Sequence, residues 1–112
     1  SAALDRAAEL IDERFAGRPD LSAQVRYGIG YSMASRYRLE QAEVQLERAL
    51  RESRAEFGPR DVRTLQVVDG IAGLRVEQSR YDTAEQGYRA VIDALEATRR
   101  QSDPLYPKAL GN

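Results

Sequence analysis

The side chains that could carry chemistry in this sequence are carboxylates, hydroxyls, arginines and a single lysine, because its 112 residues include no histidine and no cysteine. Without cysteine there can be no disulfide, no thiol nucleophile and no thiolate metal site. Without histidine there is no imidazole to act as a general base or as a metal ligand. The sequence therefore predicts a protein that is not an enzyme and that holds neither a cofactor nor a metal ion.

Two glycine-containing segments have part of a catalytic or cofactor motif. Gly28-Ile29-Gly30 matches the start of a dinucleotide-binding loop, but Met33 occupies the third glycine position and no strand is expected before it. Residues 30–34 match a nucleophile elbow until Ala34, where that motif needs glycine, and its serine would have no histidine as a base. A close-packed helix is the better interpretation of both segments.

Charged residues at helical spacing are expected to lie on solvated helix faces. The carboxylates of this kind are Asp12 with Glu13, Glu40 with Glu43, and Glu52 with Glu56. Glu47 and Arg51 have the i,i+4 spacing of a favourable pair, worth about 0.2–0.5 kcal/mol. Arg48, Arg51 and Arg54 alternate with glutamates and are predicted on the outer face of a helix; a phosphate-binding patch is the alternative interpretation.

The length indicates one small domain, and the charge indicates a surface without a large excess of either sign. With 17 basic and 18 acidic residues the formal net charge is −1, which does not favour direct contact with nucleic acid. The sequence has no run of 18 apolar residues, and its first residues lack the basic-then-apolar order of a signal peptide, so no membrane insertion is expected. The sequence does not determine the cellular compartment: the cytoplasm is favoured, and an extracytoplasmic segment of a membrane-anchored regulator is the alternative.

The sequence repeats itself with a period of 42 residues. A shift of 42 places residues 24–29 on residues 66–71 with four of the six positions identical, and it places Phe15 on Phe57. A fixed period of this size is typical of stacked structural repeats. We predict a single repeat domain over 1–112, with half a repeat at 1–22, full repeats at 23–64 and 65–106, and the start of a further repeat at 107–112. The chain is therefore expected to be a segment of a longer protein.

Apolar residues within each unit follow the i, i+4, i+7, i+8 spacing of an amphipathic helix, as in Ala42, Leu46, Ala49 and Leu50. Glycine, proline, serine and aspartate interrupt the pattern at 17–20, 58–61 and 102–104, where an aspartate or serine can cap the next helix. Helices are expected over 2–15, 21–36, 39–56, 62–78 and 81–100, with a stub from about 104. The fold class is all-α, built from antiparallel helical hairpins.

Four glycines lie inside the first helix of their units, where each costs about 0.8–1.0 kcal/mol relative to alanine. They are Gly28, Gly30, Gly70 and Gly73. We expect a close crossing of two helices to offset this cost, with Ala42 and Ala84 as small partners.

The residues that recur at this 42-residue spacing resemble the tetratricopeptide repeat (TPR) family in its 42-residue variety, which occurs in kinesin light chains and many bacterial regulatory proteins. The matching residues are Ile29, Gly30, Leu39, Ala42, Leu46 and Ala49 in one unit and Ile71, Ala72, Tyr81, Ala84, Glu85, Tyr88 and Val91 in the next. The resemblance implies an α-solenoid of about two and a half repeats. Residues 3–24 are also similar to repeat regions of bacterial signalling chains that carry kinase or winged-helix domains.

Two positions depart from the family pattern in both units. The large aromatic residue late in the first helix is replaced by Met33 in one unit and by Arg75 in the other. The glycine before the second helix is replaced by Tyr37 and by Ser79.

In the TPR family the first helix of each unit lines a concave, ligand-binding groove. Carried over by position, the resemblance places there Gln24, Tyr27, Tyr31, Ala34 and Ser35, followed by Gln66, Asp69, Gly73, Val76 and Glu77. Exposed tyrosines offer a large contact area with a polar tip, although packing of Tyr27 or Tyr31 against the preceding helix is the alternative. Asp69 and Glu77 are eight residues, about two turns, apart and so favour a basic ligand segment.

The leading hypothesis is a non-catalytic protein-protein interaction or scaffolding module of a bacterial signalling or transcription-regulatory protein, whose groove binds a peptide or a domain. The alternative is a self-assembly element, because both ends of the array are expected to expose apolar residues. These residues are Leu4, Ala7, Ala8 and Ile11 at one end and Tyr88, Ile92 and Leu95 at the other, the latter covered only by Leu105, Tyr106 and Leu110. Such ends predict a homodimer or lattice contacts that replace a missing repeat.

Overall fold

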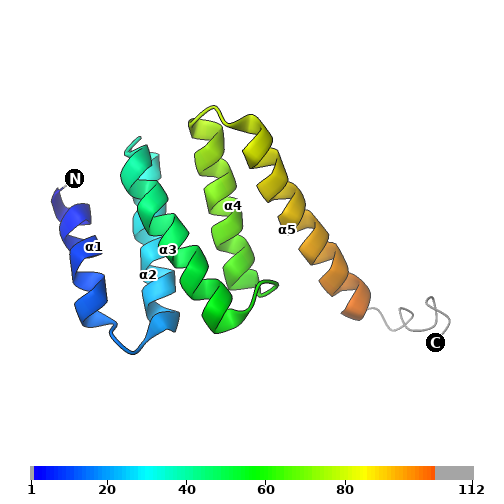
Figure 1. The fold of residues 1–112 in the computed structure, drawn as a ribbon, viewed down its shortest axis with the longest axis horizontal. Helices are drawn as coiled ribbons and strands as arrows, with labels where there is room; N and C mark the ends of the chain where they lie inside the picture. Colours follow the sequence, from blue (N-terminus) through cyan, green and yellow to red (C-terminus); the bar gives the residue numbers. More distant parts are fainter. Residues whose placement is uncertain (1, 103–112) are drawn as a thin grey trace.

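The computed structural model describes residues 2–102, which form five α-helices arranged in a row (Figure 1). The helices are α1 (Ala2–Arg14), α2 (Pro19–Ser35), α3 (Leu39–Phe57), α4 (Val62–Glu77) and α5 (Tyr81–Ser102). Consecutive helices run in opposite directions, and no strand occurs within residues 2–102. The all-α prediction is confirmed, and every helix begins and ends within two residues of the expected positions. The expected stub and the repeat predicted at 107–112 lie outside the described residues.

The row is flat and elongated. Each helix packs mainly against its neighbours in the sequence, and α2 also contacts α4. The principal extents are 57 × 36 × 15 Å, and the radius of gyration of 16.3 Å exceeds the value of about 13 Å expected for a globular domain of this length. The apolar core therefore runs along the row between adjacent helices instead of filling a central space.

The loops that join α2 to α3 and α4 to α5 have the same backbone geometry, 42 residues apart. Tyr37 and Ser79 both have a φ of 60°, in the left-handed region. In each loop the amide of this residue and the amide of the next residue donate to carbonyls in the last turn of the preceding helix, at 2.8–3.0 Å. This is the Schellman arrangement, whose left-handed residue is usually glycine. The two non-glycine residues therefore keep a backbone conformation that favours glycine.

The two helices that begin the full repeats start differently. Asp61 precedes α4, and its carboxylate accepts a hydrogen bond from the Arg63 amide at 2.8 Å, as expected of a capping aspartate. Hydrogen bonds from the side chain and amide of Arg63 lower the pKa of Asp61 to about 2. By contrast, α2 begins with Pro19 and has no side-chain cap, because Asp20 already lies in its first turn.

Buried Met33, Ala42, Leu46 and Leu74 form the centre of the core, where α2, α3 and α4 meet. Gly30 makes this packing possible, because a Cβ atom at that position would lie 2.8 Å from Cγ of Leu46. The expected close crossing is therefore present at Gly30. It is absent at Gly28, which is exposed and would have no atom within 4 Å of an added Cβ.

The same crossing recurs one period later with the glycine on the other helix. Gln45 of α3 lies 3.3 Å from the Cβ position of Gly30, and the residues 42 positions further on are Gly87 and Ala72. A Cβ on Gly87 would lie 3.1 Å from Cβ of Ala72. Each crossing thus has one glycine, and Gly87 of α5 is a packing residue that the sequence analysis missed.

The two ends of the row differ, which corrects the expectation that both are uncovered. Ile11 of α1 is 2% exposed, and Leu4 and Ala8 pack against the core, because α1 lies on α2 as an additional helix of the row. Asp5 of α1 also accepts a hydrogen bond from Arg38 at 2.6 Å. At the other end the apolar stripe of α5 is open, as expected: Tyr88, Ile92 and Leu95 are 37%, 59% and 48% exposed.

Candidate functional site

The residues expected to line a groove lie on the surface of α2 and α4, where they line two hollows. The first hollow, of about 170 Å³, includes Gln24, Tyr27 and Gln66. The second, of about 310 Å³, includes Tyr31, Ala34, Ser35, Asp69, Gly73 and Glu77. Of the residues carried over by position, Val76 lines neither hollow. We call the two hollows together the α2–α4 groove.

The second hollow combines an apolar floor with an acidic rim. Leu46 and Leu74, both nearly fully buried, contribute to the floor, and exposed Tyr31 stands at its side. The carboxylates of Asp69 and Glu77 are exposed at the rim, and no arginine or lysine of residues 2–102 lines this hollow. The arrangement creates a negative potential next to apolar surface, which suits a segment with both cationic and apolar side chains.

Tyr27 lines the first hollow and contacts Gly70, which lines the second. Its ring packs over Gly70 of α4, where an added Cβ would lie 2.9 Å from Cε1 of Tyr27. The ring centroid is also 6.1 Å from that of Tyr31. Burial raises the pKa of Tyr27, and the nearby Asp69 carboxylate and Tyr31 add to the increase. Tyr27 is therefore half-buried against α4, while Tyr31 is 58% exposed and available for contact.

Glu77, which lines the second hollow, also interacts with Tyr37 of the α2–α3 loop. The hydroxyl of Tyr37, in the α2–α3 loop, donates a hydrogen bond to Glu77 at the end of α4. This bond and the negative charge of Glu77 raise the pKa of Tyr37. The Tyr37 side chain remains 73% exposed, so it extends the aromatic surface beside Glu77 toward solvent.

The first hollow is smaller and has a different charge. Arg63 lines it beside Gln24 and Gln66, and the guanidinium of Arg63 lies 3.7 Å from the centroid of the Phe57 ring. The same guanidinium is paired with Asp61 at 2.9 Å. The α2–α4 groove thus changes along its length from an amide-rich hollow with a neutralised arginine to an acidic hollow.

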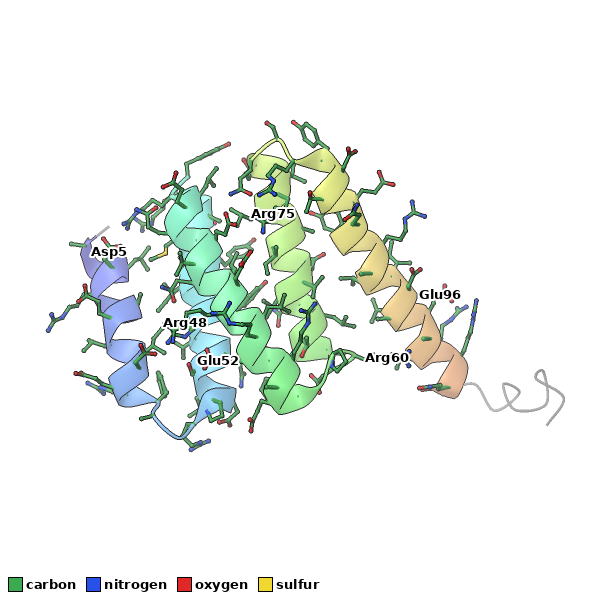
Figure 2. The ribbon with its side chains drawn as sticks, viewed as in Figure 1. Asp5, Arg48, Glu52, Arg60, Arg75 and Glu96 are labelled. Atoms are coloured by element: carbon green, nitrogen blue, oxygen red, sulfur yellow. The ribbon has the colours of Figure 1, made fainter. Side chains whose placement is uncertain are left out.

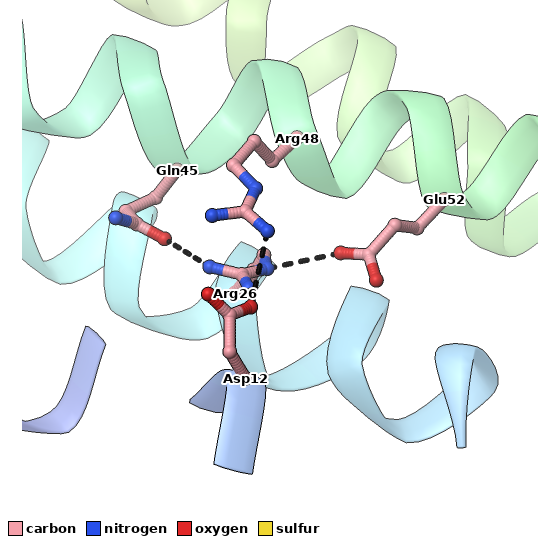
Figure 3. A network of polar contacts seen from close by, with 5 residues as sticks. All are labelled: Asp12, Arg26, Gln45, Arg48 and Glu52. Atoms are coloured by element: carbon pink, nitrogen blue, oxygen red, sulfur yellow. Dashed lines mark hydrogen bonds and ion pairs between the residues drawn. The ribbon is translucent and has the colours of Figure 1, made fainter. Parts of the chain in front are cut away.

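A buried arginine lies on the inner side of α2 (Figure 3). Arg26 is 1% exposed, and its Nε donates to Glu52 at 3.0 Å and its Nη1 to Gln45 at 3.0 Å. Its Nη2 donates to Asp12, which also accepts a hydrogen bond from Arg48 at 3.0 Å. All three side-chain nitrogens of Arg26 therefore donate a hydrogen bond, and this network joins α1, α2 and α3.

Within this network the expectation of solvated carboxylates is wrong for Glu52 alone, because Asp12 is ion-paired but remains 62% exposed. Partial desolvation opposes ionisation of Asp12, but the charges and hydrogen bonds of Arg26 and Arg48 outweigh it and lower the Asp12 pKa. Glu52 is likewise bound to Arg26 and only 26% exposed. The spacing of charges within one helix does not reveal pairs that form between helices, which is why the sequence analysis missed them.

A second inter-helix network surrounds Arg75, near the end of α4 (Figure 2). Its guanidinium pairs with Glu43 at 3.0 Å and with Glu47 at 2.9 Å, both on α3. A hydrogen bond from Gln78, together with Arg75, lowers the pKa of Glu43 despite partial burial. Glu47 therefore pairs with Arg75 of the next helix, and the expected pair with Arg51 is not formed.

Two other kinds of site receive no support from the described residues. Within residues 2–102 no three carboxylates come together in a way that could hold a metal ion. Over the same range, no helix combines the length and the apolar character needed to cross a bilayer.

Tyr88 of α5 is the groove residue that the sequence analysis assigned elsewhere. It lines the second hollow, and its hydroxyl lies 3.6 Å from the Cβ position of Gly73. The signal that could have revealed it is the period: Tyr88 is 42 positions after Leu46, which lines the same hollow.

Comparisons of the chain with protein-family models, with curated proteins and with solved structures found no match.

Proposed function

We propose that this chain is a TPR-like α-solenoid that works as a non-catalytic protein-interaction module and binds a basic peptide segment in the α2–α4 groove. The repeat architecture is supported by the period. The ends of α2 and α4 and the starts of α3 and α5 are both 42 residues apart, and Tyr37 and Ser79 adopt the same left-handed conformation at the same point of each unit.

The observation that carries the proposed ligand class is the composition of the second hollow. Asp69 and Glu77 supply negative charge, Tyr31 and Tyr88 supply aromatic surface, and no cationic side chain of residues 2–102 neutralises them there. A peptide with lysine or arginine beside apolar residues would satisfy both features. A catalytic role has no comparable support, because the groove offers carboxylates and hydroxyls without a histidine or cysteine to activate them.

The resemblance alone suggests the context of this module. We place it, as part of the proposal, in a bacterial signalling or transcription-regulatory protein, where the groove would hold a partner or another domain of the same protein.

The exposed stripe of Tyr88, Ile92 and Leu95 on α5 favours self-assembly as a second candidate function. Two copies could cover these stripes against each other. Sedimentation velocity at high micromolar concentration distinguishes the candidates: a dimer supports self-assembly, and a monomer excludes it.

The peptide proposal is tested by titrating the ¹⁵N-labelled chain with a synthetic peptide of alternating lysine and leucine. We expect chemical-shift changes confined to the backbone amides of α2, of α4 and of the turn of α5 that contains Tyr88. Replacing Asp69 and Glu77 by lysine should weaken binding about tenfold, because two opposite charges at the rim become like charges. The melting temperature should change little, since both carboxylates are exposed.

The matched control replaces Asp82 and Asp93 by lysine on α5, which changes the net charge equally without altering the α2–α4 groove. If the control weakens binding as much as the groove variant, the peptide follows total charge and the proposed groove is wrong.

A further inference from the structure

A separate groove is lined by residues of α3, α4 and α5. Its volume is about 460 Å³, and it shares no lining residue with the α2–α4 groove. Val68, Ile71 and Ala72 of α4 contribute an apolar floor. Gly87 and Ala90 make the α5 wall shallow, because neither carries a long side chain. We call this hollow the α3–α5 groove.

The charge of the α3–α5 groove is opposite to that of the second hollow. Arg51 and Arg54 line its α3 wall, and both side chains are exposed. Neither guanidinium forms an ion pair or a hydrogen bond with any of residues 2–102, whereas Arg48 is held by Asp12. The carboxylate that lines the groove, Glu47, is already bound to Arg75 at 2.9 Å. Two uncompensated positive charges therefore border an apolar floor.

From these features we infer that the α3–α5 groove binds an acidic amphipathic helix of a partner protein. An α-helix rises 1.5 Å per residue, so Arg51 and Arg54 present their charges about one turn apart along α3. Carboxylates at i and i+3 or i+4 on a docked helix have the same spacing. The apolar face of that helix would cover Val68 and Ile71, and Gln86 on the opposite wall would hydrogen-bond its polar edge.

The test uses the full chain and a fluorescein-labelled synthetic helix of leucine, alanine and glutamate, with the glutamates one turn apart along one edge. Fluorescence anisotropy should show binding that weakens as salt increases. Replacing both Arg51 and Arg54 by glutamate should weaken binding at least tenfold. The same double variant should gain affinity for a peptide in which every glutamate is replaced by lysine, because the charge complementarity is then restored.

Arg14 and Arg36 provide the matched control. Both are exposed and, within residues 2–102, unpaired, and they line no part of the groove, so replacing them by glutamate alters net charge equally. This control should leave the affinity within about twofold of the unaltered chain. An equal loss in the control and the groove variant would overturn the proposal, as would no binding at millimolar peptide.

An uncharged variant keeps the proposal testable if the double charge reversal fails to fold. Ala90→Trp on α5 should fill the groove and abolish binding with Arg51 and Arg54 intact. Amide shifts of the ¹⁵N-labelled chain should centre on Val68, Ile71 and Ala90. If inorganic phosphate alone causes the same shifts, or if a second copy of the chain occupies the groove in solution, the inferred partner class is wrong.

Discussion

Gly28 and Gly30 lie two residues apart on α2, and their replacement by alanine should change stability in opposite directions. Gly28→Ala meets no atom within 4 Å and should gain the helix propensity of alanine, about 0.8–1.0 kcal/mol. Gly30→Ala places its Cβ 2.8 Å from Cγ of Leu46, inside a core where overpacking costs about 1–3 kcal/mol. After the same propensity gain is subtracted, we expect a net loss of up to about 2 kcal/mol for Gly30→Ala.

Urea unfolding and thermal unfolding, both followed by circular dichroism at 222 nm, measure the two changes. With a shift of about 4 °C per kcal/mol for a domain of this size, the two variants should melt on opposite sides of the unaltered protein. Leu46→Ala in the Gly30→Ala background supplies the control, since it removes the atoms that the new Cβ meets. Leu46→Ala should lower the free energy of unfolding less in the Gly30→Ala background than in the unaltered chain. If both glycine variants stabilise the protein by similar amounts, the close crossing at Gly30 does not limit the packing.

Two further predictions concern the loops and helix starts. Ser79→Gly should raise the free energy of unfolding by about 0.5–1 kcal/mol, because it relieves a left-handed conformation that costs about 1–2 kcal/mol while adding entropy to the unfolded chain. The same exchange at Ser35, the last helical residue of α2, should lower the free energy of unfolding, and equal effects at both sites would contradict the argument. The pKa of Asp61 is lowered to about 2 in the folded state, so its contribution to stability is present above its ordinary value of 3.8 and is lost as pH falls toward 2. Asp61→Asn retains a capping side chain but cannot titrate, so the urea midpoint of this variant should depend less on pH between about 2 and 3.8. Parallel plots of urea midpoint against pH for the two proteins would show that the Arg63 contacts do not persist in solution.

The sequence was sufficient for the helices because their signals are local. Gly58 ends α3 and Asp61 caps the start of α4, and both effects depend only on the local sequence. The 42-residue period can likewise be found without knowing any contact between helices. The orientation of residues around each helix is harder to predict. Gly28 and Gly30 differ by about 200° around the α2 axis, and only the position of α3 determines which of them faces a neighbour.

Contacts between helices were the part that could not be predicted. Arg26 pairs with Asp12 of α1 and Glu52 of α3. Nothing in a single sequence identifies these two carboxylates, among the many in the chain, as the partners of Arg26. Tyr88 was assigned to an open apolar stripe because its helix was considered alone, whereas it also borders the second hollow through its position beside α4. In both cases the information resides in how the helices are placed side by side.

The row arrangement has a consequence for how the chain folds and opens. Since each helix packs mainly on its neighbours in the sequence, assembly brings together mostly parts of the chain that are close in sequence, and the entropy cost of closing long loops stays small. The edge helix α5 packs chiefly on α4 and can separate while the other helices stay folded. Separation would carry Tyr88 away from the second hollow. Docking of α5 and occupancy of that hollow are therefore thermodynamically linked, so a bound segment there would also make the opening of the last helix less favourable.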